Sequence, residues 1–284
     1  MDDVVSRLVG YLTAWAKGLG QASIPLLVPR ARPELPRTAS GHFHLRSELF
    51  LQLSGSTEFL FPGQSYRLDA GHALLLPPRL HHGETAVSSA ADPFLNLVLI
   101  FEGSTLFLHS AVAGAANRPQ IDKPIQQAND QYLPVARWLE EAAAAGETSP
   151  EVAVNLVAAV LASCARLLAQ NASDRIREPL LVATARSLVR NSLGDASLSV
   201  ASLAGQLACT PDYLSHRFSL ATGTRLVEWI SLLRLDRAAE LLTQTRLSSK
   251  ETAWACGFVN QSYFIRLFRQ RFGLSPLEYR RQTL

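Results

Sequence analysis

The sequence predicts an α+β protein in which a β-rich N-terminal part precedes an all-helical C-terminal part. Two observations lead to this prediction. Short apolar runs cut by glycine and proline fill residues 23–107, which is typical of antiparallel strands joined by turns. Further along, one helical pattern is written twice, at 204–223 and again at 253–273. A chain of 284 residues is long enough to bury a separate core in each part.

Charge is divided unevenly between the two parts. From Arg175 onward, 15 Lys and Arg stand against 8 Asp and Glu, a net charge of +7, whereas the first 174 residues carry 12 against 16, a net charge of −4. The basic excess therefore lies in the part that holds the repeat, as binding to a phosphate backbone requires. A solvated basic face without a ligand would give the same count.

Targeting signals and cysteine pairs are not expected. No run of about 18 uncharged apolar residues occurs, and the first residues are acidic and then interrupted by Arg7 and Lys17. We therefore expect no signal peptide, no membrane span and a cytoplasmic location. Cys164, Cys209 and Cys256 lie in apolar helical patterns without paired spacing, which favours buried free thiols in a reducing compartment.

The N-terminal part begins with an expected helix. Residues 3–19 carry apolar side chains at helical spacing, which predicts an amphipathic helix. A lid, a dimer element and an inhibitory arm are all compatible with this pattern. The strand-like runs that follow predict an antiparallel barrel or jelly roll.

Helices are expected after the strands. Residues 110–131 are poor in large apolar groups, which predicts a connecting loop. Two helices are expected at 131–145 and 151–170. The second has a broad apolar stripe, which suits either a core helix packed on the barrel or a dimer helix paired with its twin.

A polar stretch at 171–179 predicts the linker between the parts. We therefore place one domain at 1–174 and a second at 175–284, which opens with a helix at 180–191.

Each copy of the repeat has the pattern of a helix-turn-helix, in which a short helix and a tight turn precede a capped second helix. Thr210 is the expected N-cap of the second helix in the first copy, followed by Pro211 at the first helical position. In the second copy, Gly257 ends the first helix and Asn260 caps the next. The matched positions are Tyr213 with Tyr263, Leu214 with Phe264, Phe218 with Phe268 and Gly223 with Gly273.

A connecting helix is expected between the copies, from Arg225 to about Thr243. It would span roughly 30 Å, close to the ~34 Å between successive major grooves on one face of DNA. The matched apolar positions on each second helix are expected to face inward, which turns the polar residues between them toward the groove.

From Leu198 to Arg281 the chain resembles the DNA-binding domain of AraC-type (arabinose-regulator-like) transcription factors. The stretches that carry the resemblance are "SLSVASLAGQLACTPDYLSHRFSLATG", "LLRLDRAAELL" and "ACGFVNQSYFIRLFRQRFGLSPLEYRR". Thr252 departs from the family pattern, which usually has isoleucine there, and we expect looser packing of that helix.

The resemblance also implies roles for individual residues. Its base-reading positions fall on Asp212, Ser215, His216, Gln261, Ser262, Ile265 and Arg266. Tyr263 is expected on the same exposed face. Contacts with the DNA backbone are expected from Arg217, Arg225, Arg269 and Arg271.

The β-rich part resembles a cupin. His42, His44 and Glu48 stand in the His-x-His-x-x-x-Glu pattern of the first cupin motif, and His82 matches the second motif, in which Arg79 replaces the usual glycine. One interpretation is a site for iron, manganese, nickel or zinc. The other is that these side chains support the barrel mouth or contact a ligand without metal.

The barrel is expected to hold a small effector, because apolar cavities with a few polar groups bind small molecules. The candidate effector contacts are Arg30, His42, His44, Arg46, Glu48 and His82.

Taken together, the resemblances imply an effector-responsive activator of an operon for use of a carbon source, a sugar or small organic acid. Its expected partners are double-stranded DNA, a small-molecule effector, RNA polymerase and a second copy bound through residues 151–170. No enzymatic activity and no resident cofactor are expected. Two alternatives remain: a cupin metalloenzyme with a DNA-binding module, and a ligand-independent regulator of stress or virulence genes.

Overall fold

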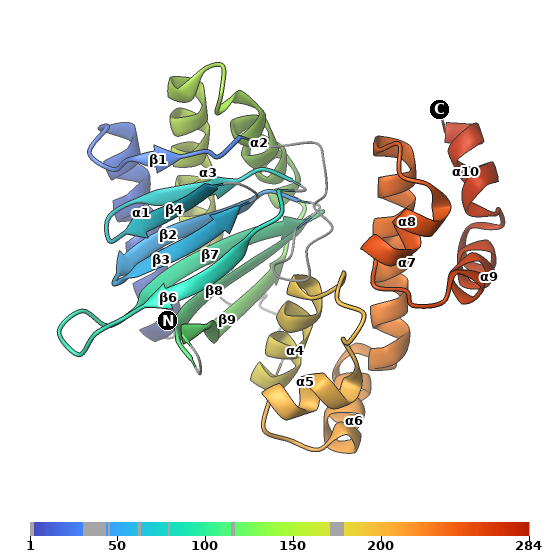
Figure 1. The fold of residues 1–284 in the computed structure, drawn as a ribbon. Coiled ribbons are helices and arrows are strands. Elements are labelled where there is room, and N and C mark those ends of the chain that lie inside the picture. The colour runs from blue at the N-terminus through green and yellow to red at the C-terminus, as the bar shows by residue number, and fades with distance from the viewer. Residues whose placement is uncertain are drawn as a thin grey trace. The chain divides into compact units, whose positions relative to one another are not determined.

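The computed structural model describes residues 3–30, 44, 46–61, 64–78, 80–114, 117–170 and 179–283. The chain divides into two compact units, Met1–Leu180 and Leu181–Leu284 (Figure 1). The first unit mixes strands and helices, and the second is helical, as the sequence predicts. The predicted linker at 171–179 falls almost wholly outside the described residues, so the boundary after residue 174 stays a prediction.

Two sheets form the centre of the N-terminal unit. Their strands are β1 Leu26–Leu27, β2 Glu48–Ser54, β3 Ser56–Phe61, β4 Gln64–Asp69, β5 Ala73–Leu76, β6 Gly83–Val87, β7 Leu95–Glu102, β8 Thr105–Ala113 and β9 Pro119–Ala128. The larger sheet has the order β1-β5-β2-β7-β8-β9, and the smaller one has the order β4-β3-β6. Strands pair antiparallel throughout, except β1 with β5. The cupin-like jelly roll itself stays a prediction.

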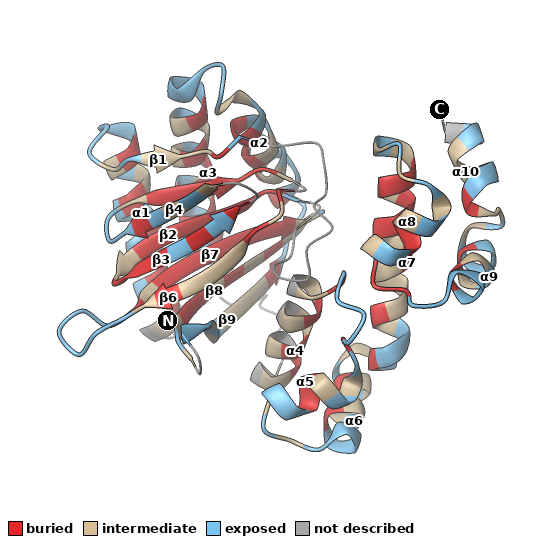
Figure 2. Ribbon diagram, viewed as in Figure 1, coloured by how far each residue is buried: buried red, intermediate tan, exposed pale blue. Residues whose placement is uncertain are grey.

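Strand β2 contributes side chains to two hydrophobic clusters, one on each of its faces. Leu49 and Leu51 pack with the helices α1 (Asp3–Gly20), α2 (Tyr132–Ala145) and α3 (Pro150–Gln170). Phe50, on the opposite face, packs with Phe59 of the smaller sheet, with ring centroids 5.0 Å apart. Since successive side chains of a strand point to opposite faces, helices cover one face of β2 and the smaller sheet covers the other. Figure 2 shows the resulting burial along the central strands.

Helix α3 is a core helix of this unit. Its apolar stripe, which includes Val157, Val160 and Leu161, is buried in the cluster that α1 and α2 also enter. By length and composition alone α3 could cross a membrane, but the buried stripe accounts for its apolar character. The stripe therefore packs inside one chain, and a dimer through 151–170 would have to use the other face of the helix.

The loop predicted at 110–131 is wrong. Strand β8 continues to Ala113, and β9 pairs with it antiparallel along most of its length. Strand β9 lies at the edge of the larger sheet and is mostly half-buried, so polar residues such as Gln120 and Lys123 are tolerated in it. Its pairing with β8 satisfies its main-chain hydrogen bonds. The strand therefore forms without the large apolar side chains by which strands are usually recognised in a sequence.

The C-terminal unit contains the helices of the repeated pattern. Their bounds are α4 Leu180–Asn191, α5 Val200–Gln206, α6 Pro211–Thr222, α7 Leu226–Gln244, α8 Ser249–Ala255, α9 Gln261–Phe272 and α10 Pro276–Thr283. Helices α5 and α6 form the first helix-turn-helix, α8 and α9 form the second, and α7 connects them. These helices match the expected ones closely because their start and stop signals are local.

Caps fix both ends of the second helix in each motif. The side chain of Thr210 accepts a hydrogen bond from the backbone N–H of Tyr213, and Asn260 does the same for Tyr263. Gly223 and Gly273 end α6 and α9 with left-handed backbone. Capping by Thr or Asn stabilises a helix by about 1 kcal/mol, so each cap helps to fix where its recognition helix begins.

The tight turn of the second motif requires glycine. Gly257 has φ +77°, and a Cβ at this position would lie 2.6 Å from the carbonyl oxygen of Leu193. The first motif has Ala208 with φ +50° at the corresponding point of its turn. The turn of the first motif is thus the more strained of the two, since a left-handed conformation costs a non-glycine residue roughly 1–2 kcal/mol.

The cysteines are free, as predicted, and Cys164 and Cys256 are buried, whereas Cys209 is only half-buried.

Thr252, which departs from the family pattern, is fully buried in α8, and its hydroxyl has no hydrogen-bond partner. We expect Thr252→Val to raise the free energy of unfolding of this unit by about 1 kcal/mol, because an unsatisfied buried hydroxyl is costly. Urea unfolding followed by fluorine NMR of fluorotryptophan at Trp254 would report on α8 itself. The matched control is Thr243→Val, whose hydroxyl donates to the carbonyl of Glu240 at 2.9 Å, and which should bring no gain. A lower unfolding midpoint for Thr252→Val would contradict the expectation.

Candidate nucleic-acid interface

Helix α6 separates an anchoring face from an accessible one. Leu214 and Phe218, four residues apart, are both fully buried. Asp212 and His216 are exposed, and Ser215 is half-buried. This is the division that the sequence predicts, because residues four apart share one face of a helix.

Helix α9 repeats the arrangement with larger anchors. Phe264 and Phe268 are fully buried, with ring centroids 5.5 Å apart. The residues on the accessible side are Gln261, Ser262, Tyr263 and Arg266, which are exposed, and Ile265, which is half-buried. A shallow depression on this helix is lined by Ser262, Ile265, Arg266, Arg269 and Gln270. The structure thus leaves every expected base-reading side chain accessible, while its contact with DNA stays a prediction.

Arg266 stands beside an aromatic ring. Its guanidinium carbon lies 5.2 Å from the ring centroid of Tyr263, one turn earlier on α9. Such a cation–π contact is worth about 0.5–1 kcal/mol at an exposed site. It therefore restricts the rotamers of Arg266 while leaving the donor groups of the guanidinium accessible.

The arginines expected to contact the DNA backbone differ in their surroundings. Arg225 and Arg269 are exposed, and Arg217 is half-buried. The guanidinium of Arg271 donates hydrogen bonds to both carboxylate oxygens of Asp236 on α7, at 3.0 and 3.3 Å. Arg271 therefore ties α9 to the connecting helix, a role that the sequence analysis missed because Asp236 lies 35 residues away.

Arg234 on α7 joins the two motifs, and its role was also missed from the sequence. Its guanidinium donates to the carbonyl oxygens of Leu193, at 3.1 Å, and Asp195, at 2.8 Å, in the segment between α4 and α5. The same group lies 5.9 Å from the ring centroid of Phe258, in the turn of the second motif. One side chain thus contacts the segment that leads into the first helix-turn-helix motif and the turn of the second motif.

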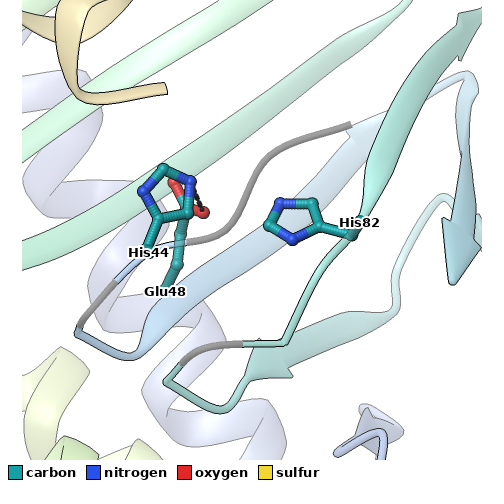
Figure 3. A group of neighbouring side chains, drawn as sticks. All are labelled: His44, Glu48 and His82. Atoms are coloured by element: carbon teal, nitrogen blue, oxygen red, sulfur yellow. Dashed lines mark ion pairs between the residues drawn. The ribbon is translucent and has the colours of Figure 1, made fainter. Parts of the chain in front are cut away.

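The other candidate site lies in the N-terminal unit. His44, Glu48 and His82 lie close enough together that one ligand atom from each falls within 4.8 Å of the others. His44 Nε2 is 3.1 Å from a carboxylate oxygen of Glu48 (Figure 3). The structure thus brings together three of the four residues of the predicted metal motif. The fourth, His42, lies outside the described residues, as does Arg79.

Glu84 is a member of this cluster that the sequence analysis missed. A carboxylate oxygen of Glu84 is 3.5 Å from His82 Nε2. His82 directly precedes β6 and Glu84 lies two residues later in it, so both side chains point to the same side. Burial and the carboxylate of Glu84 both raise the pKa of Glu48 well above its usual range.

Arg30 and Arg46, expected as effector contacts, are exposed at the surface of the N-terminal unit. Phe50 and Phe59 fill the space between the sheets. The effector contacts therefore stay a prediction, supported by the geometry only for the residues of the histidine and glutamate cluster.

A comparison with protein families locates one likeness within the C-terminal unit. Residues 203–282 match the family model of a helix-turn-helix domain. The chain is 37% identical over 127 residues to the uncharacterized HTH-type transcriptional regulator YijO of Escherichia coli K12, covering 45% of this chain and 44% of that protein. It is 31% identical over 141 residues to the arabinose operon regulatory protein of the same strain, covering 48% and 46%. The matched part spans less than half the length of these relatives.

Solved structures also match part of the chain. One is the C-terminal domain of AraT, a response regulator from Geobacillus stearothermophilus, with 32% identity, coverage of 37% of this chain and 88% of that chain, and a TM-score of 0.37. Another is the DNA-binding domain of AdpA in complex with a target DNA, with 27% identity, coverage of 36% and 90%, and a TM-score of 0.34.

The contacts of Arg234 lead to a prediction about stability. Arg234→Met should lower the free energy of unfolding of the C-terminal unit by about 1.5–3 kcal/mol, because two carbonyl oxygens lose a charged donor. Amide hydrogen exchange in α5 and α8 measures this directly, and both helices should exchange faster. Arg225→Met, on an exposed arginine that caps no backbone group with its side chain, is the matched control and should change stability by less than about 0.5 kcal/mol. Faster exchange in only one of the two helices would show that Arg234 does not join the motifs.

Proposed function

We propose that this protein is an AraC-type transcription regulator that binds specific sequences in double-stranded DNA through both helix-turn-helix motifs. The observation that carries the proposal is the repeated geometry of α6 and α9, each with two buried anchors four residues apart and polar residues on its accessible side. The match of residues 203–282 to a helix-turn-helix domain supports it. So does the net positive charge of the last part of the chain.

The length of the connecting helix is close to the spacing of major grooves on DNA. Helix α7 has 19 residues and is therefore about 28 Å long, at roughly 1.5 Å per residue. Successive major grooves on one face of DNA are ~34 Å apart. We therefore propose that α6 and α9 enter successive major grooves of one binding site.

Base readout follows from the side chains on the accessible faces. Arg266 suits a guanine, whose two acceptor groups match the guanidinium fork, and Gln261 suits an adenine. Ile265 can contact a thymine methyl group, and Asp212 can accept from a cytosine amine. Arg217, Arg225 and Arg269 are proposed to contact phosphates, which position the protein without reading sequence.

The N-terminal unit is proposed to sense the signal. An effector bound near His44, Glu48 and His82 would bias the DNA-binding unit, and the activated promoter would recruit RNA polymerase. We propose a carbon-source operon as the target, in keeping with the arabinose operon regulatory protein and the activator RhaR among the relatives. Regulation of this kind needs no enzymatic step, and a cytoplasmic location follows from binding to chromosomal DNA.

A homodimer through residues 151–170 is proposed to use the outward face of α3. This face and α1 border a groove lined mostly by small side chains, with Lys17 and Arg166 also in the lining, so a second copy can approach the backbones closely between the two charged residues. The lining includes Val9, Thr13, Ala16, Ala158, Ala162 and Ala169.

Arg266→Ala tests base readout. We expect it to cost roughly 1–3 kcal/mol of binding free energy on the preferred site, because a bidentate arginine–guanine contact is lost. Fluorescence anisotropy on a set of duplexes with single base changes should show that discrimination is lost at one base position only.

Arg269→Ala is the matched control on the same helix. It should weaken binding about equally on every duplex and reduce the salt dependence by about one ion. An equal loss on all duplexes for Arg266→Ala as well would show that Arg266 is a phosphate contact, and base readout by α9 would then fall to other residues.

A further inference from the structure

Matched hydrogen bonds close the turns of the two helix-turn-helix motifs. In the first motif, the backbone N–H of Cys209 donates to the carbonyl oxygen of Ala204 at 3.0 Å, and the N-cap Thr210 follows directly. In the second motif, the N–H of Phe258 donates to the carbonyl oxygen of Ala253 at 2.9 Å. Cys209 and Phe258 therefore occupy equivalent positions in their turns.

The second turn contains one residue more than the first. Val259 stands between Phe258 and the N-cap Asn260, in the turn that joins α8 to α9 (Figure 1). It is 84% exposed, more than any other large apolar side chain in the described part of the chain. An apolar residue before an N-cap often packs on the fourth residue of the helix, here Phe264, but this exposure shows that Val259 does not. Neither turn closure nor packing within the unit accounts for a valine at this position.

The backbone on both sides of Val259 is anchored. Phe258 is 7% exposed, and its ring centroid lies 5.1 Å from that of Phe264. On the other side, the side chain of Asn260 accepts a hydrogen bond from the N–H of Tyr263 at 2.9 Å. Val259 is thus presented from a fixed point of the turn, and little conformational entropy is lost when its methyl groups meet a ligand.

The position of Val259 favours DNA as the group that covers it. The N-terminal residues of a recognition helix contact base edges in the major groove, and Val259 lies two residues before the exposed Gln261 at this end of α9. Arg266 and Arg269 on the same helix are exposed and supply positive charge for the DNA backbone. The apolar group that bases present in the major groove is the C5-methyl group of thymine. An apolar side chain at this point is therefore matched by one base.

We propose that Val259 is a specificity-determining residue that contacts the C5-methyl group of one thymine in the DNA segment read by α9. The inference rests on the proposed function, because it requires α9 to enter the major groove. This thymine lies toward the end of the segment that Gln261 contacts. Ile265, one turn further along α9 than Gln261, contacts a different base.

The test replaces the thymines of the preferred duplex one at a time by deoxyuridine, which removes only the methyl group. Affinity of the purified full-length chain for each duplex is measured by fluorescence anisotropy at constant salt concentration. We expect one thymine at which the wild type loses about fourfold in affinity, because burial of one methyl group is worth about 0.8 kcal/mol. Val259→Ala should lose nothing at this thymine and should bind the unmodified duplex about fourfold more weakly than the wild type does.

Val227→Ala is the matched control. It removes the same methyl groups from a valine that is 61% exposed near the start of α7, and it should keep the wild-type loss at that thymine. Ile265→Ala should keep this loss as well. Because Val259 is exposed, Val259→Ala should have the Tm of the wild type, so its weaker binding would not reflect unfolding.

Two results would overturn the proposal. Equal losses for Val259→Ala and the wild type at every deoxyuridine would show that Val259 contacts no thymine methyl group. Disappearance of the loss in Ile265→Ala but not in Val259→Ala would assign the methyl contact to Ile265. A wild-type protein that prefers no DNA sequence would contradict the proposed function, and the inference with it, so the two kinds of failure are distinguishable.

Discussion

The buried side-chain pairs of the two recognition helices are the constraint on which the DNA-binding unit depends. Phe264 and Phe268 on α9 and their counterparts on α6 are fully excluded from solvent. Since an anchor at every fourth position fixes the rotation of a helix about its own axis, these pairs determine which polar side chains face outward. Loss of an anchor aromatic would typically cost 3–5 kcal/mol and would free the helix to rotate, so base recognition depends on packing as much as on the contacting groups.

Arginines on and around α7 transmit this packing from one motif to the other. Arg234 contacts the segment before α5 and the turn before α9, and Arg271 on α9 pairs with Asp236. Arg280 on α10 donates to the carbonyl oxygens of Leu242 and Leu247 near the end of α7. Some of the arginines of the C-terminal unit therefore stabilise its fold, and the others remain accessible to phosphates.

The sequence was most informative where structure is determined locally. Caps such as Thr210 and Asn260 and the spacing of buried anchors placed α6 and α9 within a residue or so of their observed bounds. Strand β9 was missed because it is defined by pairing with β8 and carries few apolar residues of its own. Glu84 was missed because its side chain faces His82 only after folding. Asp236 was missed because its partner, Arg271, lies on another helix. The apolar stripe of α3 fitted a core and a dimer equally well, and only the packing of α1 and α2 against it distinguishes the two.

The measurement that tests the account most directly is selection of random double-stranded DNA by the purified full-length protein, followed by sequencing. If α6 and α9 each read a major groove, the enriched sequences should contain two short boxes with centres about 10–10.5 base pairs apart, and Arg266→Ala should degrade only one of them. Enrichment of a single box, with no preference one helical turn away, would contradict the account, because it would mean that only one of the two motifs reads DNA.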